Sequence, residues 1–324
     1  MNDPREPLSP TRGVPALVFV NRTAGRGAAQ ASLPRVQKRF ESLRFPAEFV
    51  ETASAAELES AARRALSRGR RLLLGMGGDG TFQALANGAF GGDAIIGILP
   101  AGGGNDFAAA LGLPADPLGA AESVLKGKPR PVDLVRVRTA DGRTRLYAGG
   151  GGMGLDAEAA HYASGAYRHL PGRLRYIAAA LRALSAHVHL KVRLEFPGSD
   201  HRPLEASCLL AGVLNAPTYG GGVRLAPDAR IDDGLLHVVL IEDLSTWEVL
   251  KLLPQLMGSG ELGTSRVKRW KVKSVKMCSD RPSLFHGDGE ILGPAPVEIA
   301  VVPNAVRVLA PAHEAASAFS RAGN

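Results

Sequence analysis

Apolar runs alternate with amphipathic segments through the first 131 residues of the chain. Short continuous apolar runs are typical of buried strands, whereas apolar positions that recur every three or four residues are typical of helices. Strands that alternate with helices imply βαβ units and a parallel sheet. The pattern predicts strands at 15–20, 47–52, 72–74 and 94–99, and helices at 28–43, 55–66 and 81–89.

The pattern changes near Pro129-Arg130-Pro131, after which alternating, β-rich segments dominate. Segments near 156–186 and 245–257 have helical character, and the Asp-Gly pair at 141–142 is a hairpin signal. We therefore expect a mainly antiparallel second domain. The predicted organisation is a disordered N-terminus over 1–13, an α/β domain over 14–131, a β-rich domain over 132–311 whose last segment could return to the first domain, and a flexible tail over 312–324.

Composition narrows the class of protein. The 324 residues are 45% hydrophobic and 22% charged, as in ordinary soluble globular proteins. Cys208 and Cys278 lie far apart and lack metal-site spacing, so we expect a reducing cytoplasm rather than a disulfide framework or zinc site. The first residues do not resemble a signal peptide, and no apolar run is long enough to span a bilayer. Membrane contact should be peripheral, and the net charge of +8 would favour nucleic acid or acidic lipid.

The stretch Leu72–Gly88, LLLGMGGDGTFQALANG, places a glycine-rich turn between a strand and a helix. Such turns bind phosphate, because glycine lets the backbone approach closely and the helix N-terminus offers amide donors. Residues 75–80 match a dinucleotide-binding fingerprint, but the next strand ends without the expected acidic residue. Walker A and protein-kinase signatures are missing as well. Asp79 would orient the loop or hold Mg²⁺ near phosphates; the simplest alternative is a helix cap.

Five motifs in register resemble the catalytic domain of the bacterial diacylglycerol and lipid kinases, relatives of the sphingosine kinases. They are VNRTAGRG at 20–27, GGDGT with a later ANG at 77–88, LPAGGGNDFAAALG at 99–112, GGGVRLAPDARIDDGLL at 220–236, and HGDGE at 286–290. The chain departs from the family pattern in three places. Arg22 replaces a proline, Gln83-Ala84 replaces Asn-Glu, and Gly103 replaces a threonine.

The resemblance implies ATP-dependent phosphoryl transfer to a lipid hydroxyl. It also implies that a nucleotide-binding α/β domain, similar to that of NAD kinases and phosphofructokinases, faces a C-terminal β-sandwich domain across a cleft. Those two families share the GGDG turn, but they do not resemble this chain at 21–25 or around Asp233. The implied nucleotide-binding residues are Asn21, Thr23, Gly25, Thr52, Gly77, Gly78, Asp79, Gly80, Thr81, Gly103 and Asn105. For Thr52, a helix N-cap is an equal alternative.

Asp288 and Glu290 form the acid/base pair that the resemblance points to, with Asp79 as a third catalytic residue. A buried carboxylate can take the proton of a lipid hydroxyl as that hydroxyl attacks the γ-phosphate. We favour Glu290 as the base and Asp288 as a ligand or orienting group. A plain Asp-Gly turn is the alternative.

A second Mg²⁺ site is implied at the segment APDARIDDGLL, where Asp228, Asp232 and Asp233 cluster. Oxygen-rich turns of this kind bind hard cations. By resemblance, the ligands are the Asp233 carboxylate and the carbonyl groups of Arg230 and Leu235. This ion would be structural, and a polar hairpin without metal is the alternative.

The segment 265–277, SRVKRWKVKSVKM, alternates six basic residues with apolar ones. We favour an exposed edge strand that uses lysines against aggregation. Contact with an anionic membrane is the alternative, because each nearby cation contributes about 1 kcal/mol. RNA binding would need an aromatic platform, which the segment lacks.

The leading hypothesis is a cytoplasmic lipid kinase, peripheral to the inner face of the membrane, that uses ATP and Mg²⁺ to phosphorylate diacylglycerol or a related lipid. A soluble-metabolite kinase of the NAD-kinase type and a non-catalytic nucleotide-binding protein are the alternatives. We expect no nucleic-acid partner, and a homodimer is left open.

Overall fold

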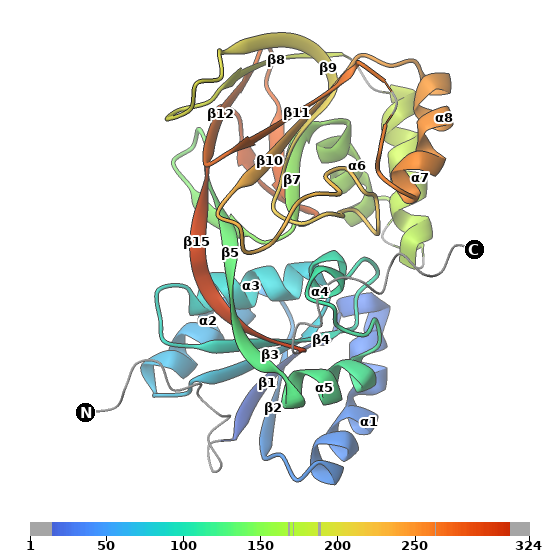
Figure 1. Ribbon diagram of the computed structural model, residues 1–324. Coiled ribbons are helices and arrows are strands. Elements are labelled where there is room, and N and C mark those ends of the chain that lie inside the picture. Colours follow the sequence, from blue (N-terminus) through green and yellow to red (C-terminus); the bar gives the residue numbers. More distant parts are fainter. Residues whose placement is uncertain (1–14, 168, 171, 187–188, 263, 312–324) are drawn as a thin grey trace.

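The computed structural model describes residues 15–311, apart from 168, 171, 187, 188 and 263 (Figure 1). The predicted disordered ends, 1–13 and 312–324, therefore lie outside the described residues. The first part of the chain is an α/β layer with a parallel sheet, as predicted, and the strand order of this sheet is β4-β3-β1-β2. Its strands are β1 (Ala16–Asn21), β2 (Ala47–Thr52), β3 (Leu72–Gly77) and β4 (Ile95–Pro100).

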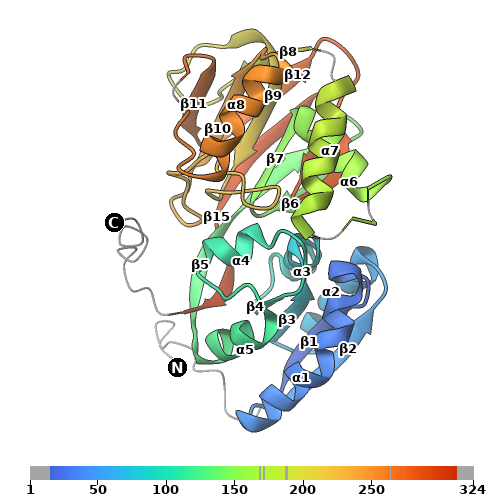
Figure 2. The ribbon, with the colours of Figure 1, turned by 90° about the vertical axis from the view of Figure 1, so that its right-hand side faces the viewer.

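Helices cover this sheet because its central strands are apolar throughout. Every residue of β3 and β4 is buried, which requires cover on both faces. In Figures 1 and 2, α1 lies beside α5 and α2 beside α3. The helices are α1 (Ala28–Ser42), α2 (Ala55–Ser67), α3 (Asp79–Ala89), the short α4 (Asp106–Ala110) and α5 (Pro117–Lys126), and the single turn η1 (Ala24–Gly27) precedes α1.

The cap alternative for Thr52 is wrong. Ser54 is the N-cap of α2, and its hydroxyl accepts a hydrogen bond from the Glu57 backbone N–H. Thr52 itself is buried at the end of β2, and its hydroxyl lies 3.4 Å from the Val20 carbonyl oxygen. It therefore stays among the predicted nucleotide-binding residues.

The second part of the chain is β-rich and mainly antiparallel, as predicted. The helical segment expected at 156–186 is two helices, because Gly165 ends the first of them. The helices are α6 (Leu155–Ser164), α7 (Gly172–Ala186) and α8 (Thr246–Met257). The strands are β5 (Lys128–Arg138), β6 (Thr144–Tyr147), β7 (Gly150–Gly154), β8 (Leu190–Glu195), β9 (Leu204–Leu214), β10 (Leu236–Glu242), β11 (Val267–Val272), β12 (Ser274–Ser279), β13 (Leu284–Gly287), β14 (Glu290–Pro294) and β15 (Val297–Ala310).

A long antiparallel ribbon of β5 and β15 joins the two parts (Figure 1). The C-terminal end of β15 reaches the first sheet, where Arg307 and Val308 pair with Ile95 and Ile96 of β4. The predicted domain boundary at 131/132 falls inside β5, which runs through it without interruption. The two parts are thus held together by backbone hydrogen bonds as well as by side chains.

The basic segment 265–277 is not one edge strand. Among the described strands, β11 pairs only with β10, whereas β12 lies between β8 and β15. Lys268 and Lys276 form ion pairs with Glu242 and Glu298. The edge-strand interpretation therefore holds for β11 only. Across the described residues, no helix is long and apolar enough to cross a membrane.

Candidate active site

Two glycine-rich loops meet at the carboxyl ends of β3 and β4. A Cβ atom on Gly102 would lie 2.4 Å from the Cα of Gly78, so the two backbones touch. Gly25, with φ of +58°, packs against Ala101, the residue before Gly102. A Cβ on Gly25 would lie 2.1 Å from the Ala101 carbonyl oxygen. The first-strand turn and both glycine loops thus share one edge of the sheet, where ligand sites of open α/β sheets lie.

Asn21, at the end of β1, links the first turn to the GGDGT loop. Its Nδ2 donates a 3.0 Å hydrogen bond to the Thr81 hydroxyl. Its Oδ1 accepts hydrogen bonds from both the backbone N–H and the hydroxyl of Thr23. These contacts bring three of the predicted nucleotide-binding residues together, although they come from turns that are 60 residues apart.

Asp79 orients the second glycine loop. Its carboxylate accepts hydrogen bonds from the N–H groups of Asn105 and Phe107, at 2.9 and 3.1 Å. Asn105 has a left-handed backbone, with φ of 59°, and its side chain exchanges two hydrogen bonds with the backbone of Gly102. Asp79 therefore caps α4 across the site rather than its own helix, and Gly103 lies inside the loop that these bonds close.

Three carboxylates crowd the space beside these loops. Burial raises the pKa of Asp79 to about 7, and the negative charges of Asp106 and Asp288 contribute to the rise. Asp79 and Asp106 flank Gly104, since a Cβ there would lie 3.1 and 3.3 Å from their carboxylate oxygens. The Asp106 carboxylate also accepts hydrogen bonds from the N–H groups at 221–222, across the junction between the two parts. Crowded carboxylate oxygens suit a hard divalent cation.

Asp288 is fixed by the β-rich part of the chain. It lies in the turn between β13 and β14 with a left-handed backbone, at φ of 51°. Its carboxylate accepts hydrogen bonds from three consecutive N–H groups, those of Ala148, Gly149 and Gly150, at 2.8, 2.8 and 3.2 Å. Burial raises its pKa to about 6, and these three hydrogen bonds oppose the rise. This geometry suits an orienting group better than a mobile proton acceptor.

Glu290 begins β14 and reaches the first glycine loop. One of its carboxylate oxygens lies 3.3 Å from the position that a Cβ on Gly80 would take. The residue is accessible to solvent, yet enough protein surrounds the carboxyl for desolvation to raise its pKa, while the charge of Arg175 opposes the rise. A carboxylate beside this glycine loop with a raised pKa suits proton transfer.

The helix after GGDGT locks the two parts of the chain together. Asn87, from the ANG motif, exchanges two hydrogen bonds with the backbone of Leu146, at 2.8 and 3.1 Å. Gln83 donates a 3.0 Å hydrogen bond to the Gly287 carbonyl oxygen, next to Asp288. The departure at Gln83 therefore has a clear structural use, since it docks α3 on the turn that carries the predicted acid/base pair.

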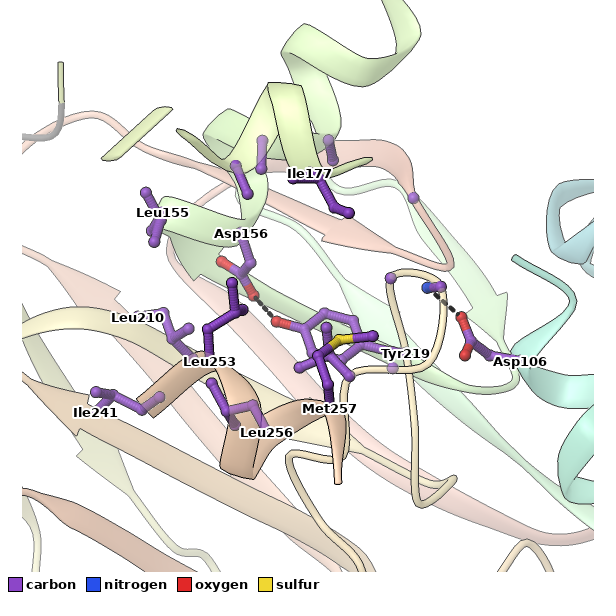
Figure 3. A pocket seen from close by; sticks show the side chains of 18 of the residues that line it. Asp106, Leu155, Asp156, Ile177, Leu210, Tyr219, Ile241, Leu253, Leu256 and Met257 are labelled. Atoms are coloured by element: carbon purple, nitrogen blue, oxygen red, sulfur yellow. Dashed lines mark hydrogen bonds between the residues drawn. The ribbon is translucent and has the colours of Figure 1, made fainter. Parts of the chain in front are cut away.

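An apolar cavity of about 350 Å³ extends from these carboxylates into the β-rich part (Figure 3). Asp79, Asp106 and Asp288 line one end of it. Strands β9 and β10 and helices α6, α7 and α8 supply the walls. The wall residues of α7 and α8 are partly exposed, so the cavity opens to the surface between these two helices. Its apolar lining includes Leu155, Ile177, Leu210, Ile241, Leu253 and Leu256.

A small polar cluster interrupts the apolar lining. The Tyr219 hydroxyl donates to the Asp156 carboxylate over 3.4 Å (Figure 3), and His286 Nε2 lies 3.2 Å from the same carboxylate. Within the described residues, neither ring nitrogen of His286 makes a hydrogen bond of good geometry, although the residue is buried. In the sequence, His286 appeared only as the first residue of the HGDGE motif, and no role was predicted for Asp106, Asp156, Tyr219 or the cavity walls. Asp106 alone had a signal, because it lies in the NDF motif.

The predicted structural-metal turn lies between the loop at 220–222 and β10. Asp233 accepts a 3.0 Å hydrogen bond from the Leu235 N–H, and Arg230 is exposed. The adjacent Asp232 forms an ion pair with Arg130 at 2.6 Å. The three predicted ligand residues, Arg230, Asp233 and Leu235, thus lie within one turn. The metal-binding role of this turn stays a prediction.

Two family models together match most of the chain. One, described as the diacylglycerol kinase catalytic domain, matches residues 15–137. The other, described as the YegS C-terminal NAD kinase beta sandwich-like domain, matches residues 151–310. A diacylglycerol kinase of Mycobacterium tuberculosis is 32% identical over 77% of this chain and 80% of its own length.

The chain belongs to the diacylglycerol kinase family.

Further relatives agree with this family. A diacylglycerol kinase of Bacillus subtilis is 26% identical over 93% of this chain and 97% of its own length. The crystal structure of a diacylglycerol kinase from Bacillus anthracis has the same fold, with a TM-score of 0.70 at 19% identity over 91% of this chain and 96% of that one. The predicted family, fold class and enzyme class, a lipid kinase, are confirmed. Use of ATP follows from membership of a kinase family, whereas the individual site residues stay predictions.

Proposed function

We propose that this protein transfers the γ-phosphate of ATP to the hydroxyl group of diacylglycerol or a related lipid at a membrane surface on the cytoplasmic side. The observation that carries this proposal is the cavity of about 350 Å³, which has apolar walls and ends at three carboxylates beside the glycine loops. A small water-soluble acceptor would leave those walls without contacts, whereas an acyl chain would cover them.

The glycine loops would hold the phosphates. Gly77, Gly78 and Gly80 place no side chain over this loop, and the N-terminus of α3 adds a favourable dipole. The close approach of Gly78 and Gly102 fits this use, because a side chain on either would fill the cradle. The predicted nucleotide contacts of Asn21, Thr23 and Thr52 lie at the same edge of the sheet. Bound ATP would supply the phosphoryl group.

Asp79 and Asp106 would hold the catalytic Mg²⁺. Their carboxylates flank the same glycine, and their mutual repulsion contributes to the raised pKa of Asp79, which a cation between them would relieve. Asp288 would keep the turn of the acid/base pair in place through its three backbone hydrogen bonds. Glu290 would accept the proton of the lipid hydroxyl, because its carboxyl is the one of the pair that faces the phosphate loop.

Incubation with labelled ATP and Mg²⁺ tests the proposal. The acceptors are diacylglycerol in vesicles and, in parallel, NAD and other soluble alcohols. Label found in phosphatidic acid supports the proposal. Label found only in a soluble product would assign a soluble-metabolite kinase instead, and ATP binding without transfer to any acceptor would identify a non-catalytic nucleotide-binding protein.

A further inference from the structure

The exposed large apolar side chains of this protein are concentrated on two helices. Of the nine that are exposed among the described residues, seven belong to α7 and α8. Single exposed apolar residues are ordinary on a protein surface, whereas a contiguous group marks an interaction site. We define the docking face as the six residues Leu174, Ile177, Leu181, Trp247, Leu250 and Leu253.

The docking face follows from the helical pattern of both segments. Residues 174, 177 and 181 form one stripe along α7, and residues 247, 250 and 253 form one along α8. Each helix also has a second apolar side that packs inward, through Ala183 and Leu184 in α7 and through Leu252 and Leu256 in α8. An ordinary surface helix is polar on its outer side. Trp247 is 66% exposed and Leu174 is 59% exposed, so the outer sides are uncovered in this chain.

The docking face surrounds the mouth of the apolar cavity. Figures 1 and 2 both place α7 and α8 on one side of the β-rich part. Ile177 and Leu181 from α7, and Leu250 and Leu253 from α8, belong to the docking face and also line the cavity. The apolar surface is therefore continuous from the exterior to the carboxylates.

The charges on these helices favour an anionic surface as the occupant. Along α7 and α8 the sequence has three arginines and one lysine against one glutamate. Lys251 Nζ lies 5.6 Å from the centre of the Trp247 ring, which pairs an aromatic residue with a cation as at membrane interfaces.

We propose that α7 and α8 form the membrane-docking surface of this protein, which lays the docking face on an anionic bilayer so that a lipid passes from the membrane into the cavity between the two helices. The proposal rests on the lipid-kinase function proposed above. It assigns membrane contact to an apolar face, not to the basic segment 265–277, where two of the lysines are already paired.

Vesicle binding of a double variant, Leu174→Ser with Trp247→Ser, tests the proposal. Neither residue lines the cavity. We expect the wild type to co-sediment with phosphatidylcholine vesicles that contain phosphatidylglycerol, and the variant to bind them about tenfold or more weakly. Phe90→Ser is the matched control, because Phe90 is also an exposed apolar residue but follows α3 in the α/β part. Equal binding of wild type and double variant would overturn the proposal.

Turnover separates this proposal from the proposed function. With monomeric dihexanoylglycerol as acceptor, the double variant should match the wild type, whereas with long-chain diacylglycerol in vesicles it should lose activity in proportion to binding. A wild type that binds vesicles and phosphorylates neither acceptor would refute the kinase proposal and leave the docking face standing. A wild type that phosphorylates both and binds vesicles no better than the double variant would refute the docking face alone.

Two further measurements address two other possibilities. The double variant could fold poorly, and the docking face could bind a second copy of the chain. Brominated acyl chains should quench part of the wild-type tryptophan fluorescence, and Trp247→Phe, which keeps an apolar ring, should remove that quenching. Unchanged quenching would place Trp247 outside the bilayer and overturn the proposal. Sedimentation velocity reports the oligomeric state, and a wild-type dimer that the double variant converts to monomer, with vesicle binding unchanged, would make this face a subunit interface instead.

Discussion

The glycine-loop edge consists of backbone and short polar groups, whereas the cavity is lined by large apolar side chains. The two regions adjoin at the same carboxylates. At the loop edge, backbone groups and short polar side chains hold one another at fixed distances, as in the contact between Gly78 and Gly102. In the cavity, large apolar side chains from five elements enclose a space that no single hydrogen bond defines. A phosphate needs directed donors, whereas an acyl chain needs only a dry volume. The difference implies that single atoms matter at the loop edge and that volume matters in the cavity.

The largest effect is expected at the junction, from Glu290→Gln. If Glu290 accepts the proton of the lipid hydroxyl, turnover should fall by about 10²- to 10⁴-fold, because the amide cannot act as a base. ATP affinity, measured by calorimetry, should stay unchanged. Glu205→Gln, which changes an exposed glutamate in β9, is the control. Turnover near the wild-type value would show that Glu290 is not the base and would assign that role to Asp288.

Filling the cavity should have the next largest effect. Ala159 of α6 lines the cavity and is only partly buried, so Ala159→Phe can project its ring into the space. We expect about a tenfold or greater loss of turnover with long-chain diacylglycerol, since a misplaced acceptor loses the in-line geometry. Dihexanoylglycerol should be affected less. Ala159→Ser, which keeps the volume, is the control, and an equal loss with both acceptors would show that the cavity does not hold the acyl chain.

The buried carboxylate of the loop edge should appear in the pH dependence of stability. The folded-state pKa of Asp79 is raised to about 7, so the folded protein keeps a proton that the unfolded chain releases near pH 4. The free energy of unfolding should therefore decrease as pH rises from about 4 to 7, by up to about 4 kcal/mol for this group. Asp79→Asn should flatten this slope in urea unfolding with EDTA present. The exposed Asp200→Asn should keep the slope, and an equal slope in Asp79→Asn would contradict the assignment.

The smallest effect concerns the turn around Asp233, which belongs to neither region. If its carboxylate binds a structural Mg²⁺, EDTA should lower the wild-type melting temperature by a few degrees, because an ion that binds only the folded state stabilises it by about 1–3 kcal/mol. Asp233→Ala should melt at the same temperature with and without EDTA. Wild-type melting that ignores prolonged treatment with EDTA would leave Asp233 as a turn residue.

The sequence by itself determined the parallel sheet, the glycine loops and the family. Alternation of strands and helices fixes a βαβ topology, and loops that follow parallel strands must share one edge of the sheet. The sequence also predicted that Asp79 orients a glycine loop, whereas the hydrogen bond from Asn21 to Thr81, which joins turns 60 residues apart, came from the structure. Such local patterns can be predicted from sequence because backbone geometry and glycine spacing are properties of short stretches.

Only the tertiary structure decided the cavity, the Asp156–Tyr219–His286 cluster and the exposed faces of α7 and α8. The cavity walls come from segments spread over about 100 residues, and each wall residue is an ordinary apolar residue in its own segment. A helix with apolar residues on two sides predicts burial, and nothing in its sequence tells which side is left uncovered. Asp106 illustrates the same limit, since its hydrogen bonds to 221–222 join residues 115 positions apart. Which apolar and charged groups become neighbours is set by packing between distant segments, and packing is not encoded in any one of them.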